Sequence, residues 1–142
     1  MAAGDLVVFD EAKLAMLNGA HDFDTHVFKV ALITNAVTAA AGDLTPILAD
    51  YTQVTGTGYT AGGETPTKTL TEAAGTVTFD FTSDAAWTQN GAGFTNAFQA
   101  IIYNDTSATD EAVAFIDMAG PVSLVSGDVT ISWNASGVFT LA

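Results

Sequence analysis

The sequence contains no cysteine and no arginine, and each absence excludes a class of chemistry. Without cysteine the chain can form no disulfide, thiolate nucleophile, iron–sulfur centre or cysteine-ligated zinc site. Lysines are its only strongly basic side chains, 3 in number, and 16 acidic residues bring the formal net charge to −13. Because so few bases cannot neutralise phosphates, we expect neither nucleic-acid binding nor adhesion to an anionic membrane.

The chain also lacks a basic amino-terminal segment and a long apolar run. Its first residues, MAAGDLVVFDEAK, carry acidic side chains where a secretory signal would have basic ones. No stretch approaches the ~18 apolar residues that a membrane-spanning helix needs. We therefore expect a soluble protein that is made in a cytoplasm.

Charged side chains are scarce, at 13% of the residues against about 25% in an ordinary soluble domain. Since the mean hydropathy is +0.33, threonine, alanine, serine and glycine must cover much of the outside. Such a surface suits a protein that packs against copies of itself or a partner, and the alternative is a monomer with a threonine-rich exterior. The length of 142 residues predicts a single domain over residues 1–142.

Residues 27–34, VFKVALIT, form an apolar, β-branched stretch that predicts a strand buried inside a sheet. A short helix is predicted before it, with Asp10 as its N-cap and the Asn-Gly pair at 18–19 as its stop. Leu14 and Leu17 share one face of this helix, which must therefore lie on another surface.

Further strand signals recur at intervals of about ten residues. They cover residues 67–71, 76–82, 98–103, 112–118, 129–133 and 138–141. The alternating helices that a parallel sheet requires are missing. We predict an all-β domain, an antiparallel β-sandwich or partly closed barrel of about seven to eight short strands. One short N-terminal helix lies in an arm over residues 1–19, and the β-body covers residues 27–142.

The segment 51–65, YTQVTGTGYTAGGET, is rich in glycine and is either an edge strand with bulges or an ordered loop. Gly56, Gly58 and Ala61 satisfy the G-x-G-x-x-[GA] spacing of dinucleotide-binding sites. That spacing should open a helix, but further glycines and Pro66 follow at once. The glycines are better explained by a close backbone approach to a neighbouring strand or chain.

Three groups of polar or aromatic residues could form a ligand site, and a structural role is favoured for each. His21 and His26 should point to opposite faces of an extended segment, which makes them turn residues rather than metal ligands. The acidic segment 104–111 lacks calcium-loop spacing and is expected to be a solvated hairpin tip. Trp87 and Trp133 could stack on a sugar, but at strand spacing they belong in the core.

No catalytic, cofactor-binding or metal-binding residue is predicted, and we do not expect an enzyme. Asp80 lies on the polar face of an alternating strand, and Asp117 is the only acid within a strongly apolar run. One buried acid does not make a hydrolytic pair. The chain also lacks the G-x-S-x-G spacing of a serine nucleophile.

The order of several segments, from about Asp10 to Trp133, resembles a widespread group of small virion proteins of tailed bacteriophages. These segments are LNG at 17–19, KVALI at 29–33, VTGTGYTAGG at 54–63, AIIYND at 100–105 and GDVTISW at 127–133. Members of the group are regarded as structural, and several look like capsid decoration or cement proteins. The loop 35–50 departs from the group by its length and its alanine content.

The resemblance implies a capsid decoration or cement protein. We expect such a protein to bind the major capsid protein on the outer surface of the virion, as a dimer or trimer. An acidic protein is repelled by packaged DNA, which agrees with an outer position. The alternatives are a tail, neck or fibre component and, from a different class, a sugar- or calcium-binding adhesion module. No cofactor is expected.

The expected contact residues lie in three segments, namely the glycine tract, the loop 35–50 and the N-terminal helix. They are Gly56, Gly58, Tyr59, Gly62, Gly63, Leu44, Ile47, Leu14 and Leu17.

Overall fold

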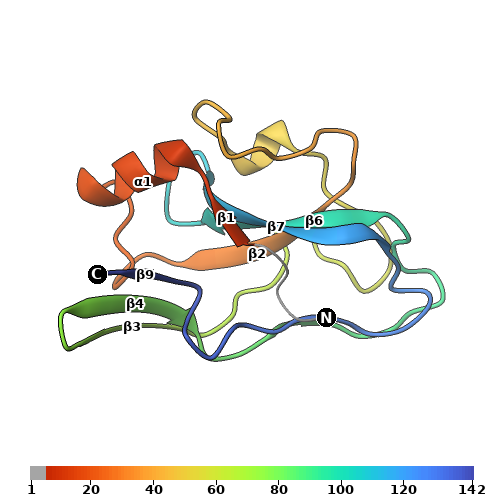
Figure 1. The fold of residues 1–142 in the computed structure, drawn as a ribbon. Helices are drawn as coiled ribbons and strands as arrows, with labels where there is room; N and C mark the ends of the chain where they lie inside the picture. The colour runs from red at the N-terminus through yellow and green to blue at the C-terminus, as the bar shows by residue number, and fades with distance from the viewer. Residues whose placement is uncertain (1–5) are drawn as a thin grey trace.

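The computed structural model describes residues 6–142, which form nine strands, one α-helix and one short 3-10 helix (Figure 1). In chain order these are β1 (Leu6–Val8), α1 (Asp10–Leu17), β2 (Phe28–Ile33), η1 (Leu48–Asp50), β3 (Lys68–Ala73), β4 (Thr76–Phe81), β5 (Ala85–Trp87), β6 (Ala97–Asn104), β7 (Glu111–Val122), β8 (Val129–Ile131) and β9 (Phe139–Leu141).

The strands form three open sheets, with the orders β1-β7-β6-β2, β3-β4-β9 and β5-β8, and all of their pairings are antiparallel. The prediction of an all-β, antiparallel fold with one short helix is confirmed. The described residues contain nine strands rather than seven or eight, and no closed barrel. The amino-terminal arm belongs to the β-body, because β1 pairs with β7.

The four-stranded sheet is the middle layer of the molecule. Figure 1 shows α1 and η1 on one side of this sheet and the β3-β4-β9 sheet on the other. Strand β6 is buried on both faces along nearly its whole length and β7 over residues 112–116, because both faces of their sheet are covered there. This explains why the AIIY segment, at residues 100–103, is continuously apolar rather than alternating.

An aromatic cluster joins the middle sheet to the β3-β4-β9 sheet. The ring of Phe23 stacks on Phe28 of β2 with centroids 4.7 Å apart, and it meets Phe79 of β4 edge-on at 4.9 Å. Phe79 in turn stacks on Phe139 of β9 at 5.1 Å. Aromatic pairs of this geometry contribute about 0.5–1.5 kcal/mol each beyond their buried area, so this cluster is a main link between the two layers.

Strand β2 is an edge strand of its sheet, yet it is almost entirely buried. The glycine tract explains the difference, because it lies along the outer edge of β2. Val30 exchanges two backbone hydrogen bonds with Glu64, and the backbone N–H of Val54 donates to Leu32. The hydroxyl of Tyr59 accepts the remaining bond, from the backbone N–H of Leu32 at 3.1 Å. The tract is thus an ordered cover for a strand edge that would otherwise be open.

The start of the helix differs from the prediction. Phe9, not Asp10, is the N-cap residue, and no side-chain hydrogen bond caps the helix. The side chain of Phe9 is fully buried against Phe115, with ring centroids 5.1 Å apart, so packing outweighs the usual preference for a polar cap. The predicted stop is confirmed, because Asn18 is the C-cap and Gly19 follows with a φ of +83°.

Candidate interaction surface

Three leucine side chains are exposed on the elements that cover the outer side of the middle sheet. Leu14 and Leu17 of α1 are 60% and 80% exposed, and Leu44 of the loop 35–50 is 81% exposed. The helix packs on the sheet through Ala12 instead, the only buried residue that it has. The two helix leucines therefore face away from the fold, and with Leu44 they form the set that we call the outer leucines.

The loop that carries Leu44 is held in place by specific hydrogen bonds. The backbone N–H of Ala39 donates to Oε1 of the buried Gln99 at 2.8 Å, and the hydroxyl of Tyr51 donates to Asp43 at 2.8 Å. The backbone N–H of Asp10 donates to the carbonyl of Ala41 at 2.9 Å, which ties the loop to the start of α1. The helix and the loop thus form one connected surface.

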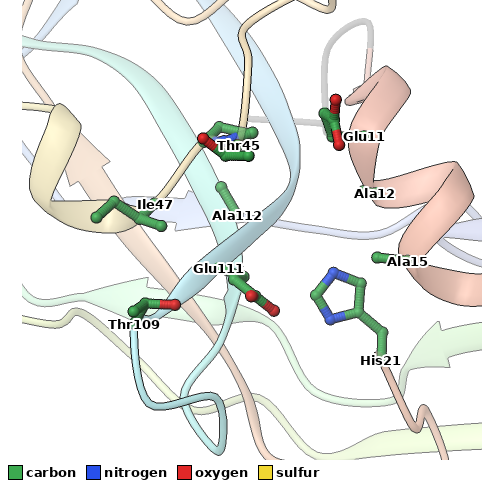
Figure 2. A pocket seen from close by; sticks show the side chains of 10 residues that line it. Glu11, Ala12, Ala15, His21, Thr45, Ile47, Thr109, Glu111 and Ala112 are labelled. Atoms are coloured by element: carbon green, nitrogen blue, oxygen red, sulfur yellow. The ribbon is translucent and has the colours of Figure 1, made fainter. Parts of the chain in front are cut away.

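A pocket of about 320 Å³ lies between α1, the loop and the start of β7 (Figure 2). Its walls are largely apolar and include Ala12, Ala15 and Ile47. Its titratable groups are two carboxylates, from Glu11 of α1 and Glu111 of β7, and the imidazole of His21, and two threonines add hydroxyl groups. Of the predicted contact residues, only Ile47 lines this pocket.

His21, which lines the pocket, is held in place by the buried amide of Asn104. The Thr106 backbone N–H donates to Oδ1 of Asn104 at 3.1 Å, so Nδ2 of Asn104 must face the opposite way. There it lies 3.2 Å from Nδ1 of His21 and 2.9 Å from Nδ1 of His26. An amide nitrogen only donates, so both Nδ1 atoms accept and both imidazoles are neutral with the proton on Nε2.

This arrangement corrects two predictions. His21 and His26 converge on Asn104 instead of pointing to opposite faces, because residues 22–25 form a turn rather than an extended approach. In that turn, Asp22 accepts hydrogen bonds from the backbone of Asp24 and Thr25. The segment 104–111 is not wholly a solvated tip either, since Asn104 is fully buried.

Burial is the main cause that lowers the pKa of His21 below its ordinary value. The nearby carboxylate of Glu111 opposes the shift, and His26 adds to it. Because a neutral imidazole is also what the Asn104 amide requires, both effects favour the same protonation state. The three hydrogen bonds to Asp22 lower the pKa of that carboxyl in the adjacent turn.

The glycine tract lies away from the pocket, along β2. Gly56 and Gly58 are exposed, while Gly62 and Gly63 are half-buried against the edge strand. Burial raises the pKa of Tyr59 to about 12, and its hydroxyl donates to Gln53 at 2.8 Å. The structure therefore groups the predicted residues into two surfaces, with the outer leucines and Ile47 on one and the tract on the other.

Other residues considered for ligand binding are used within the fold. Trp87 is 2% exposed, as a core tryptophan should be, and Trp133 donates its indole N–H to the carbonyl of Ser83. Asp117 is exposed, contrary to the expectation of a buried acid, because β7 turns its side chain outward. Within residues 6–142, no three His, Asp or Glu side chains are arranged to hold a metal ion.

Sequence reasoning missed the pocket, because its polar groups come from separate segments. Glu11 follows the helix start, His21 follows the helix end, and Glu111 opens β7. No local pattern links these positions, although the apolar run after Glu111 marks it as a strand start.

The class of protein that these observations define is an antiparallel β-sandwich with a helix-and-loop surface. Comparison of the chain with family models, curated proteins and solved structures finds no match in any of the three. Among the described residues, no helix is long and apolar enough to cross a membrane.

Proposed function

We propose that this protein is a virion structural protein of a tailed bacteriophage, a decoration or cement protein on the outer surface of the capsid. In this role it binds the assembled shell of the major capsid protein and stabilises it. The observation that carries the proposal is the exposure of the outer leucines on one connected surface. Exposed leucines on a firmly held surface are typical of a site that a protein partner covers.

The charge of the chain supports an outer position. A formal net charge of −13 repels packaged DNA, which is itself a dense polyanion. The shell then lies between the two, with the acidic decoration protein outside and the genome inside.

Stabilisation needs no catalytic group. A ligand that binds only the assembled shell shifts the equilibrium toward that state by mass action. At a free concentration of 100 times the Kd, binding stabilises the assembled shell by about 2.7 kcal/mol per site, and a capsid contains many copies of the site.

A sedimentation experiment tests this function. Purified protein is mixed with assembled shells that lack it, and separately with unassembled capsid subunits. We expect saturable binding to the shells and at least tenfold weaker binding to the subunits. No binding to the shells would contradict the proposal, and imaging of the particle would show whether density lies on the tail instead.

A further inference from the structure

Strand β3 has an open edge. It is an outermost strand of the β3-β4-β9 sheet and, among the described residues, it pairs only with β4. Residues 69–73 of this strand are exposed. Figure 1 shows the β3-β4 hairpin at the rim of the molecule, on the side of the middle sheet away from α1. The free edge of β3 thus offers a row of backbone groups with which another strand can pair.

The other strand edges in the described part of the chain are covered or short. The glycine tract lies along β2, and β1, β5, β8 and β9 have three residues each. Strand β3 has six residues, contains no proline and pairs with β4 without a bulge. Its one lysine, Lys68, lies at the start of the strand, where its ammonium donates to the backbone carbonyls of Phe23 and Asp24. The centre of the edge therefore has none of the features that usually prevent pairing.

The hairpin fixes which backbone groups of β3 point outward. Ala73 pairs with Thr76 across a two-residue turn, and the backbone N–H of Thr82 donates to the carbonyl of Thr67 at 2.7 Å. Bonded and non-bonded pairs alternate in an antiparallel ladder, so every second residue from 67 to 73 bonds to β4. The N–H and C=O groups that point away from β4 belong to residues 68, 70 and 72.

One register joins two copies of this edge through all of these groups. A two-fold axis at Leu70 places Leu70 opposite its own copy and Lys68 opposite the partner's Glu72. Each outward residue then meets an outward residue, and each such pair exchanges both of its backbone hydrogen bonds. Moving the axis to position 69 or 71 would leave one outward residue of each copy unpaired. The register that uses the most hydrogen bonds is therefore also the one that pairs opposite charges.

The side chains fit this register. The ammonium of Lys68 has three donors and two carbonyls of its own chain use two of them, so one remains for the partner's Glu72. One carboxylate oxygen of Glu72 accepts the N–H of Gly75 at 2.8 Å, and the other accepts no hydrogen bond from the described residues. Thr69 lies across from the partner's Thr71, and cross-strand threonine pairs favour association.

We propose that two copies of this chain pair along β3, antiparallel and about a two-fold axis at Leu70. The three-stranded sheets of the two copies then form one continuous sheet. A second copy is favoured over a strand of another protein because the charges of this edge complement themselves. The segment 68–72 carries one lysine and one glutamate, so the contact adds no net charge. Salt screens the repulsion between the two acidic chains beyond about 8 Å.

This inference does not depend on shell binding. The outer leucines lie on the other side of the middle sheet, so the pairing of β3 leaves them free (Figure 1). A dimer carries two such surfaces, related by the two-fold axis.

Amide hydrogen exchange at different protein concentrations tests the register. At about 1 mM protein, the amides of residues 68, 70 and 72 should exchange at least about tenfold more slowly than in dilute protein. The amides of Thr69 and Thr71 already bond to β4 and should change less. Sedimentation over the same concentrations should show an equilibrium between monomer and dimer.

Charge substitutions test the contact between Lys68 and the partner's Glu72. Glu72→Lys places lysines opposite one another and Lys68→Glu places glutamates opposite one another, so each variant alone should dimerise about tenfold more weakly. A mixture of the two variants restores both opposite-charge pairs and should form mixed dimers with the wild-type affinity. Asp128→Lys is the control, because this exposed residue lies outside the β3-β4-β9 sheet and the change in charge is the same as in Glu72→Lys.

Leu70→Pro provides a second variant if Lys68→Glu unfolds the chain. Proline is tolerated on an edge strand where the lost N–H faces outward, so the fold should be kept while the central pair of the dimer is lost. This variant should remain monomeric at about 1 mM.

Wild-type protein that stays monomeric at about 1 mM, or a dimer that neither Glu72→Lys nor Leu70→Pro weakens, would overturn the proposal. If shells protected the β3 amides of a monomeric protein, a strand of the shell protein would be the occupant, which would overturn self-pairing as well. A dimer that passes these tests but does not bind shells would support the pairing and refute the shell function.

Discussion

The backbone of Gly63 passes so close to Val30 that a Cβ atom at Gly63 would stand 1.9 Å from the Val30 carbonyl oxygen. Gly63 also has a φ of +73°, which disfavours any other residue. This contact seats the glycine tract on the edge of β2. The tract therefore protects an apolar strand from pairing with other chains, whatever else its exposed side contacts.

Gly63→Ala should destabilise the protein by at least about 2 kcal/mol, through backbone strain and the clash with Val30. Urea unfolding measures the change. Gly91→Ala is the matched control, because nothing lies within 4 Å of a Cβ there and its φ is not positive. Equal stability of the two variants would show that the tract does not hold the edge of β2.

Tyr59→Phe should lower the unfolding free energy by about 1–3 kcal/mol. The substitution removes the hydroxyl that accepts the Leu32 backbone N–H and leaves that buried donor without a partner. Amide hydrogen exchange measures the effect at Leu32 itself. The Leu32 amide should exchange faster, while the Val30 amide, which donates to Glu64, should change less. Unchanged exchange at Leu32 would contradict this role.

Stability should fall as the pH drops below 6.5, the ordinary pKa of histidine. The native pKa of His21 is lowered, so between the native and unfolded pKa values the unfolded chain binds more protons. The contribution of His21 to the free energy of unfolding is therefore fully present above pH 6.5, and it is lost as the pH falls toward the native pKa. Chemical unfolding between pH 5 and 8, with NMR titration of the imidazoles, measures it. A His21 pKa above 6.5 would contradict the buried neutral state.

Asn104→Asp should reverse this pH dependence. A carboxylate at position 104 can only accept, so His21 and His26 must become protonated at Nδ1 to keep their contacts. The native pKa of His21 would then rise, and stability would be greatest below pH 6.5 and be lost as the pH rises through the raised value. The same unfolding series checks this, and an unchanged slope would argue against the assigned tautomers.

The double substitution Leu14→Gln and Leu17→Gln should leave folding almost unchanged, within about 0.5 kcal/mol per site, because both side chains are exposed. Shell binding should weaken about 100-fold, since two leucines buried in a contact contribute about 3 kcal/mol or more. Leu141→Gln is the control, because Leu141 is 65% exposed but lies in the β3-β4-β9 sheet. Equal shell affinity of the double variant and the control would exclude the outer leucines as the contact.

Seven of the nine described strands could be predicted closely from the sequence, because alternation and β-branching are local, whereas the three-residue strands β1 and β5 were not predicted. The strand predicted at 76–82 is β4 (Thr76–Phe81), and the one predicted at 98–103 is β6 (Ala97–Asn104). The end of the helix could be predicted for the same reason, since the backbone preferences of Asn18 and Gly19 are enough to end α1.

The features that could not be predicted from the sequence depend on contacts between segments that are far apart along the chain. Asn104 and His21 are 83 positions apart, and only the folded chain brings them within 3.2 Å. Phe9 replaces the expected polar cap because tertiary burial outweighs a local preference. The pocket between Glu11 and Glu111 likewise requires that α1 packs beside the start of β7, which no periodicity records.

The most direct test of the account is the thermal stability of shells with and without this protein. Shells that lack the protein are heated alone, with the wild-type protein added back, and with the Leu14→Gln, Leu17→Gln variant. We expect the wild-type protein to raise the melting temperature of the shell in a saturable manner, while the variant should have little effect at the same concentration. A melting temperature that does not change when wild-type protein is added would contradict it.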